Sequence, residues 1–344
     1  MHPCFRPWLV SLALIGLGWS GCTAGKRSTP EAEPATSVEV APPTSPHSKQ
    51  KKHSGAYPHF QLVLEQAWQL NAPGNERFDA SGLLVLTNGD LLTISDRGAS
   101  LFRIEFLPGV SSANLVLVTN CFTELQLAGF APQKHGRYDC EGIGRDDRGR
   151  LYICEEDNRW ILRFDPATQK VERLEIDWKP VRKYFNLRNA NASFEGVAVG
   201  GNRLYVANER DKGRIIVVDL ATLRVIDDFT VGTKRWLTSD VHYSDLSWYD
   251  GALYALLREK QVVLKVNPET HAILAEYDFS EIEERREFAY HTRAGTGVME
   301  GLAVTKDAIW LATDNNGLSR KRYPQDTRPT LFKCARPDGA GKSN

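Results

Sequence analysis

The chain has 344 residues, with 43 Lys plus Arg and 43 Asp plus Glu. This formal net charge of zero excludes a general electrostatic attraction to nucleic acid or to an anionic membrane surface. Hydrophobic residues make up 42% of the chain and charged residues 25%, which is typical of a soluble globular protein.

The N-terminus predicts an export signal. Arg6 precedes a short apolar run, Trp8–Trp19, which is too short for a comfortable transmembrane helix, and Ser20–Cys22 follows. A cysteine after small residues resembles a bacterial lipoprotein signal with Cys22 as the lipidated residue, although Trp19 stands where such signals usually carry an aliphatic residue. We therefore expect an exported lipoprotein of the cell envelope, at the outer membrane or cell surface; a periplasmic or secreted protein is the alternative.

Composition then divides the chain. Residues 1–22 form the expected signal peptide, and residues 23–56 are rich in Pro, Ser and Thr without apolar periodicity, which indicates a disordered tether. We expect a folded domain over residues 57–336 and a disordered tail over residues 337–344.

An internal repeat indicates the fold of the central domain. Each of five segments has a short apolar strand, a turn rich in Gly, Asp and Asn, a second strand with alternating large residues, and a third strand that ends in a turn such as "FDPAT" or "VDLAT". The segments begin at Ser81, Glu141, Glu195, Ser244 and Glu300. Four-stranded antiparallel units at a spacing of about 50 to 60 residues predict an all-β fold, a single β-propeller.

Five repeats favour five blades, with a sixth, degenerate blade in the long connections as the alternative. The segment Phe60–Leu70 precedes the first repeat, and we expect it to form the outer strand of the last blade. Thr330–Ala335 would then supply the third strand of that blade, so that the two ends of the domain close the ring.

Carboxylates recur at one end of the predicted channel. The first strand of each blade lines the channel, and antiparallel pairing places the start of strand one and the end of strand two on the same face. Converging carboxylates repel one another unless a cation lies among them, and an oxygen-only ligand set suits a hard divalent cation, Ca²⁺ above all. The candidate metal ligands are Glu141, Glu195, Glu300, Asp314, Glu209, Glu156 and Asp96.

A structural role for these carboxylates stays open beside the metal site. A glutamate before a glycine can accept backbone N–H groups of the neighbouring blade and so hold the ring together. Pairing with Arg97, Arg210 or Arg258 would satisfy a carboxylate equally well. Asp79, Asp139 and Asp245 stand close to the same positions in the sequence.

Four cysteines follow the lipidation site: Cys121, Cys140, Cys154 and Cys334. In an oxidising compartment they allow two disulfides, and the sequence leaves all three pairings open. Without a CxxC or CxxxH pair, a zinc site or a thiol redox site is not expected.

Several phrases carry a resemblance to known families. "FDASGL", "ISDRG", "DCEGIGRDDRGRLYICEED", "SFEGVAVGGNRLYVANE" and "VMEGLAV" resemble the SdiA-regulated propeller family and the related esterase-like phytase domain. The resemblance implies an extracytoplasmic propeller with a Ca²⁺ site, and its phytase-like side implies phosphoester hydrolysis. Glu141, Glu195 and Glu300 match the glutamate pattern, whereas Ser81 and Ser244 depart from it, which puts a multi-metal phosphatase site in doubt.

Two functions are open at this point. The first is a lipid-anchored protein that binds an envelope protein or a small-molecule ligand, with Asp177–Asn189 as part of its contact surface. The second is a metal-dependent hydrolase, a phosphoesterase or a lactonase-like esterase, with His242 or His291 as general base because both precede a strand-one start. The lack of GxSxG, P-loop and HExxH motifs speaks against a serine hydrolase. We expect a monomer that contacts the membrane only through its lipid and binds no nucleic acid.

Overall fold

The computed structural model describes residues 57–130, 137–186, 188–189, 192–211, 213–232, 241–293 and 296–339. The predicted signal peptide, the lipidation site Cys22 and the tether lie outside these residues. None of the helices in the described part of the chain is long and apolar enough to cross a membrane.

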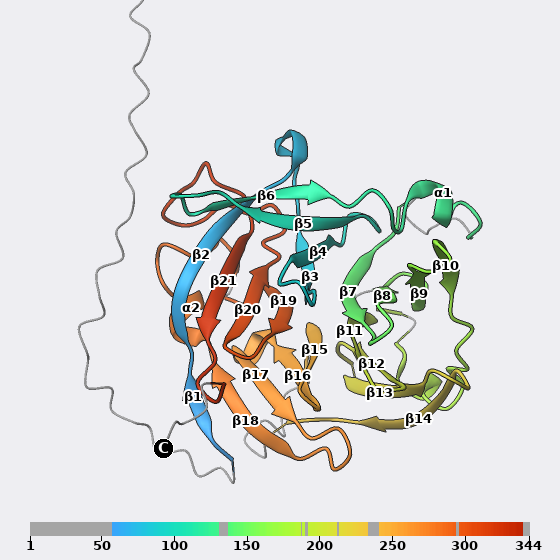
Figure 1. The fold of residues 1–344 in the computed structure, drawn as a ribbon. Helices are drawn as coiled ribbons and strands as arrows, with labels where there is room; N and C mark the ends of the chain where they lie inside the picture. Colours follow the sequence, from blue (N-terminus) through green and yellow to red (C-terminus); the bar gives the residue numbers. More distant parts are fainter. Residues whose placement is uncertain are drawn as a thin grey trace, which may run out of the picture. The chain divides into compact units, whose positions relative to one another are not determined.

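Five antiparallel blades of four strands each surround the centre of the domain (Figure 1). Blade one consists of β3 (Ala80–Val85), β4 (Leu91–Ser95), β5 (Leu101–Phe106) and β6 (Ser112–Leu117). Blade two consists of β7 (Cys140–Arg145), β8 (Leu151–Glu155), β9 (Trp160–Asp165) and β10 (Lys170–Arg173). Blade three consists of β11 (Phe194–Gly200), β12 (Arg203–Asn208), β13 (Arg214–Asp219) and β14 (Arg224–Phe229).

The remaining blades include strands from both ends of the domain. Blade four consists of β15 (Asp245–Tyr249), β16 (Ala252–Leu257), β17 (Val262–Val266) and β18 (Ile273–Asp278). Blade five consists of β19 (Met299–Val304), β20 (Ala308–Thr313), β21 (Thr330–Ala335) and the N-terminal β2 (Val63–Asn71). Short helices, α1 (Glu124–Leu127) and α2 (Ser280–Glu283), lie in the connections after blades one and four.

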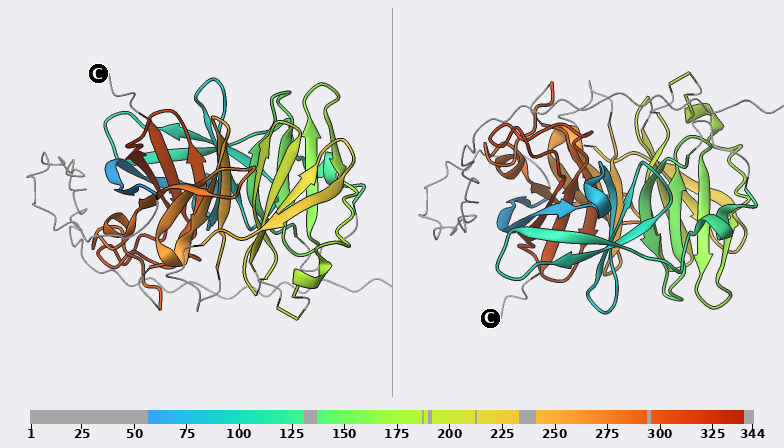
Figure 2. Two further views of the ribbon diagram at one scale, coloured as in Figure 1. Left: turned by 90° about the horizontal axis from the view of Figure 1, so that it is seen from below. Right: turned by 90° about the horizontal axis from the view of Figure 1, so that it is seen from above.

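The inner strands close a ring. β3, β7, β11, β15 and β19 each pack against the next, and β19 packs against β3 (Figure 1). Figure 2 shows the same blades from two further directions, with the strands running between the two faces of the domain. The predicted propeller and its five blades are therefore confirmed.

Both ends of the domain take part in closing this ring, as expected. β2 pairs antiparallel with β21, so the N-terminal segment is the outer strand of blade five. The end of β2 also runs parallel to β6 of blade one, with Leu70 opposite Ala113. Before it, β1 (His59–Gln61) runs parallel to β18 and adds a fifth strand to blade four. The first described residues thus contact three blades.

An apolar cluster fills each interface between neighbouring blades. Tyr205 and Leu253 belong to the cluster between blades three and four, and Ile153 and Leu92 to the one between blades one and two. The alternating large residues of the second strands face these clusters, because side chains in a strand point to opposite sides in turn. Burial of these clusters is the main stabilising contribution to the ring.

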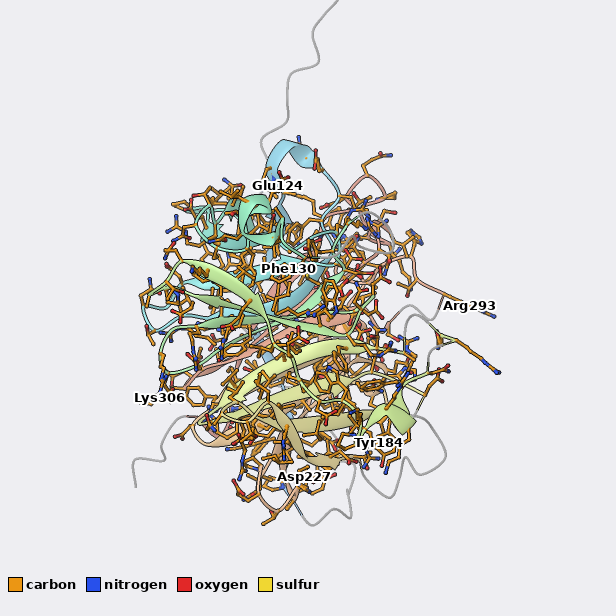
Figure 3. All side chains as sticks on the ribbon, turned by 90° about the vertical axis from the view of Figure 1, so that its right-hand side faces the viewer. Glu124, Phe130, Tyr184, Asp227, Arg293 and Lys306 are labelled. Carbon is orange, nitrogen blue, oxygen red and sulfur yellow. The ribbon has the colours of Figure 1, made fainter. Side chains whose placement is uncertain are left out.

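The connection between blades two and three packs inward. Trp178 and Phe185 both contact Phe194, with ring centroids 4.9 and 5.6 Å apart. Tyr184, labelled in Figure 3, belongs to the helix η2 (Arg182–Tyr184), and the Arg214 guanidinium lies 4.2 Å from its ring centroid. The aromatic side chains of this segment therefore cover blade three, which agrees with the alternative interpretation of the segment as a loop over the blade edge; contact with a partner stays a prediction.

The cysteines and the C-terminal boundary differ from expectation. Cys121, Cys140, Cys154 and Cys334 are all free and buried, so neither of the two possible disulfides is present among them. Each cysteine belongs to one of the apolar clusters, and burial raises the pKa of each thiol. Asp338, in the tail expected to be disordered, accepts a 2.8 Å hydrogen bond from Lys265 Nζ.

Candidate metal centre at the channel mouth

The glutamates at the strand starts occupy β-bulges. In β11 the pairing with β12 passes from Phe194 to Gly196, which leaves Glu195 as the extra residue. Glu141 in β7 and Glu300 in β19 stand at the same kind of irregularity. A bulge bends the strand and redirects a side chain. It explains why a carboxylate can stand at the head of a buried apolar strand without entering the core.

Three carboxylates of blade two converge. One oxygen each from Asp139, Glu141 and Glu156 can be chosen so that all three lie within 4.8 Å of one another. The Glu156 N–H donates a 2.7 Å hydrogen bond to the Asp139 carbonyl, which holds the end of strand two against the residues before strand one. In this blade, the start of the first strand and the end of the second strand therefore lie side by side, as expected.

Electrostatic repulsion is strong in this triad, Asp139, Glu141 and Glu156. Burial and the Glu156 carboxylate raise the pKa of Glu141 well above its usual value. Burial and Asp139 raise the pKa of Glu156 to about 8. Carboxyl groups that hold protons near neutral pH indicate that the ionised forms lack sufficient positive charge nearby.

Blades one and five add two carboxylates at the edge of the triad. Burial, with the charges of Asp79 and Asp139, raises the pKa of Asp96 to about 6. Burial and Asp79 raise the pKa of Asp314 to about 7. Asp314 also accepts a 2.6 Å hydrogen bond from the backbone N–H of Asn316, which fixes its position at the end of β20.

The other half of the mouth is neutralised by arginine. Arg258, at the end of strand two in blade four, lies 2.7 Å from the Glu209 carboxylate of blade three and also pairs with Glu300 of blade five. Arg210 forms a second ion pair with Glu209. Glu195 lies between the two halves: burial raises its pKa well above the usual value, Glu209 adds to the shift, and Arg258 opposes it.

Six of the seven predicted ligands therefore divide into two groups, and Glu195 lies between them. Glu141 and Glu156 belong to the triad, and Asp96 and Asp314 lie electrostatically close to it. Glu209 and Glu300 are held by Arg258, which matches the alternative of arginine pairing.

A residue outside the predicted ligand set joins the blades. Asp245 occupies the position that Gly196 and Gly301 hold in the neighbouring repeats, and its side chain is fully buried. Its carboxylate accepts backbone hydrogen bonds within blade four and from blade five. The inter-blade role considered for the glutamates thus belongs to this aspartate. The signal was visible in the sequence, because "SD" replaces "EG" in the fourth repeat.

Neither candidate histidine contacts the triad in the described part of the chain. His242 Nδ1 lies 2.6 Å from Glu259 Oε1, at the end of blade four. The side chain of His291 is exposed, and its backbone N–H donates to Ser319. The structure thus gives no support to a general base at either position.

A basic cavity of about 600 Å³ lies beside the acidic half of the mouth. Its lining includes Arg77, Arg97 and Arg137. Arg77 Nε lies 2.6 Å from the Asp79 carboxylate, and Arg97 lies 3.9 Å from it. From the sequence, Arg97 was expected only as a possible partner of a carboxylate at the mouth. Arg77 and Arg137 were not predicted as site residues, because they precede the first and second repeats and have no equivalent in the repeat pattern.

The triad fits a divalent cation. It offers three carboxylate oxygens without sulfur or imidazole, which is the donor chemistry that Ca²⁺ and Mg²⁺ prefer. A cation would relieve the repulsion that raises the pKa of Glu141 and Glu156. Chemically, the triad suits a cation, and the neighbouring cavity lined by Arg77, Arg97 and Arg137 suits an anion.

Fold and site together define the class: a five-bladed β-propeller whose channel mouth carries converging carboxylates. The chain belongs to the phytase-like family, described as "Esterase-like activity of phytase", whose model matches residues 79–317. This match supports the phytase-like side of the resemblance seen in the sequence, while likeness to the SdiA-regulated family stays a prediction. No curated protein matches the sequence significantly.

Solved structures of two enzymes are similar to this chain. Glutaminyl cyclase from Myxococcus xanthus is similar over 81% of this chain and 97% of its own, with 13% identity and a TM-score of 0.52. Virginiamycin B lyase from Staphylococcus aureus is similar over 81% of this chain and 76% of its own, with 14% identity and a TM-score of 0.38. At this identity the likeness to the cyclase shows the fold alone.

Proposed function

We propose that the protein is a divalent-cation-dependent phosphoester hydrolase. The observation that carries this proposal is the triad, whose three carboxylates lie within 4.8 Å of one another next to an arginine-lined cavity. Membership of the phytase-like family supports the same reaction class. The sequence favoured a protein that binds a ligand without converting it. The hydrolase would also have to bind its ligand at the mouth, so ligand binding is common to both functions.

Asp139, Glu141 and Glu156 would hold the cation. When bound, such a cation supplies positive charge to phosphoryl oxygens and makes water a better nucleophile at neutral pH. Arg77 and Arg97 would orient the phosphate group, since a guanidinium fork matches its oxygens. Asp96 lies next to this cavity, since its carboxylate is 3.5 Å from the hydroxyl of the lining residue Ser95, and it would be the group that exchanges a proton with the leaving oxygen.

Cation binding tests the first half of the proposal. Isothermal titration of the EDTA-treated protein with Ca²⁺, Mg²⁺ and Mn²⁺ should show binding that Glu141→Gln weakens on the order of tenfold or more, since one ligand charge is lost. The matched control is Glu175→Gln, an exposed glutamate paired with Arg173. Equal affinity in wild type and Glu141→Gln would exclude the triad as the cation site.

Phosphate release from a panel of phosphomonoesters tests the second half. Turnover should require the added cation and should fall in Glu141→Gln and Glu156→Gln but not in Glu175→Gln. Cation binding without release of phosphate from any substrate would refute the hydrolase and leave a cation-dependent binding protein.

The protein would act outside the cytoplasm on a lipid anchor at Cys22. This part of the proposal rests on the signal-like sequence Trp8–Cys22. Cys22→Ser should move the full-length protein from the membrane fraction to the soluble fraction and abolish incorporation of labelled fatty acid. Unchanged fractionation and labelling would refute the anchor.

A further inference from the structure

The arginine-lined cavity has two chemically different sides. Arg77, Arg97 and Arg137 line one side. Ser95 also lines the cavity, and its hydroxyl lies 3.5 Å from the Asp96 carboxylate, so this side adjoins the acidic half of the mouth. The lining carries three guanidinium groups and one carboxylate, Glu76, and Asp79 pairs with Arg77 and Arg97 from outside the lining. These five groups leave one net positive charge, which favours an anion.

The opposite side is apolar. Phe78 and Phe102 form an edge-to-face pair with ring centroids 5.1 Å apart, and Leu117 is 47% exposed beside them. An exposed leucine next to a partly exposed aromatic ring gains free energy when an apolar group covers it. A volume of about 600 Å³ lies within the usual range for a small organic ligand.

We propose that this cavity binds an aryl phosphomonoester, with its phosphate on the arginine side and its aromatic ring against Phe78, Phe102 and Leu117. Hydrolysis of this ester rests on the proposed hydrolase function. Recognition of its aromatic group rests only on the residues that line the cavity. In the reaction, water adds to phosphorus and the bond from phosphorus to the aryl oxygen breaks. ArO–PO₃²⁻ and H₂O thereby give ArOH and HPO₄²⁻, with one water proton on the phenol oxygen.

A fully polar substrate fits this cavity poorly. An inositol carrying a phosphate on every carbon would place at least one phosphate against Phe102 and Leu117, where it would lose water without gaining a donor. The neighbouring cavity of about 1080 Å³ shares Arg77 and Phe78, and Asp326 pairs with its arginines Arg320 and Arg328 much as Asp79 pairs with Arg77 and Arg97. The apolar side distinguishes the smaller cavity, because Phe102 and Leu117 line that cavity alone of the two. The smaller cavity therefore selects an ester with one anionic end and one apolar end.

Equilibrium binding of two non-hydrolysable probes tests ring recognition. Calorimetry on the full-length protein, with Ca²⁺ and with EDTA, should show phenylphosphonate binding about tenfold more tightly than methylphosphonate. Phe102→Ala should remove most of this preference, whereas Phe106→Ala, four residues along the same strand and outside the cavity, should keep it. Leu117→Asn, at an exposed position that folding does not require, should also weaken phenylphosphonate alone.

Arg97→Gln should weaken both phosphonates to a similar degree, since both carry the same anionic group. Equal affinity for the two phosphonates in wild type, or a preference that survives both Phe102→Ala and Leu117→Asn, would overturn the proposal.

Turnover separates this inference from the proposed function. Phenyl phosphate should be hydrolysed with a higher kcat/KM than glycerol 2-phosphate or inositol hexakisphosphate. Cation-dependent hydrolysis with inositol hexakisphosphate as the best substrate would overturn the inference and keep the hydrolase. Selective binding of phenylphosphonate without any hydrolysis would refute the hydrolase and support the aromatic binding site.

Discussion

Asp245 of blade four and Leu302 of blade five join two neighbouring inner strands: Asp245 Oδ2 accepts a 2.7 Å hydrogen bond from the backbone N–H of Leu302. Its other oxygen accepts a 2.7 Å hydrogen bond from the N–H of Leu246. Burial raises the pKa of Asp245 well above its usual value, although these N–H donors act in the opposite direction. One side chain thus links two inner strands where no strand pairing joins them.

Replacing Asp245 should therefore destabilise the ring. Asp245→Ala leaves two buried N–H groups without their acceptor, at a cost of about 1–3 kcal/mol for each. Asp245→Asn keeps one acceptor oxygen and should lose less. Urea unfolding measures both losses, with Asp147→Asn in an exposed turn as the control. A free energy of unfolding unchanged in Asp245→Ala would show that the blades do not depend on this link.

Arg258 should be a second point of weakness. Its side chain is 15% exposed and those of Glu209 and Glu300 are 0% and 9% exposed. Its removal takes the arginine from the buried Glu300 and leaves Glu209 with Arg210 alone. Arg258→Gln should cost about 3–5 kcal/mol, as for other broken buried ion pairs. The exposed pair of Arg173 and Glu175 provides the control, because Arg173→Gln should cost about 1 kcal/mol or less. Similar losses in both variants, measured by urea unfolding, would contradict the assigned role of Arg258.

The tight approach of the inner strands predicts a large effect of one methyl group. A Cβ on Gly196 would lie 2.7 Å from Asp245 Cα and 2.7 Å from the backbone N of Leu246, and backbone atoms cannot move aside as a flexible side chain can. Gly196→Ala should therefore cost several times as much stability as Gly129→Ala, where a Cβ meets no atom within 4 Å. Thermal unfolding of the two variants checks this, and equal midpoints would mean that the inner strands can separate.

Much of this architecture could be predicted from the sequence. The repeat reveals blades because each blade must fill both of its interfaces with alternating apolar residues, which leaves a periodic pattern. The closing strand could be predicted because Phe60–Leu70 precedes the first repeat and belongs to none of the five segments. The observed strand is Val63–Asn71, and Phe60 belongs to β1 of blade four instead. The meeting of Glu141 with Glu156 followed from antiparallel pairing alone.

The division of the mouth could not be predicted in the same way. Alignment of the five repeats shows which residues stand at the same end of the channel. It does not show where each side chain points, because that depends on bulges such as the one at Glu195. Arg258 stands at the end of strand two in its repeat, where the other repeats carry carboxylates. The sequence does not show that it reaches both Glu209 and Glu300. The cavity arginines come from connections between strands, where no periodicity applies.

The raised pKa values predict an unusual dependence of stability on pH. Burial and neighbouring carboxylates raise the pKa of Asp96 to about 6, of Asp314 to about 7 and of Glu156 to about 8. Unfolded carboxyl groups titrate at about 4, so the native state binds more protons between about pH 4 and pH 8. The free energy of unfolding of the cation-free protein should therefore fall as the pH rises through this range.

Asp326 acts in the opposite sense and sets the acid limit. Although burial acts to raise its pKa, hydrogen bonds from Arg328 and the charge of Arg320 lower it to about 2. The stability that this group contributes is present above about pH 4 and is lost as the pH falls toward 2. We expect the cation-free protein to be most stable near pH 4 to 5.

Urea unfolding in EDTA at pH 5, 6, 7 and 8 measures this dependence. Glu156→Gln should flatten the decline, because the glutamine carries no charge at any of these pH values, while Asp147→Asn should leave it unchanged. Saturating Ca²⁺ should raise the free energy of unfolding more at pH 8 than at pH 5, since protons compete with the cation for the same carboxylates. A cation-free stability that is constant or rises from pH 5 to pH 8 would contradict the raised pKa values, because groups that titrate normally give no decline in this range.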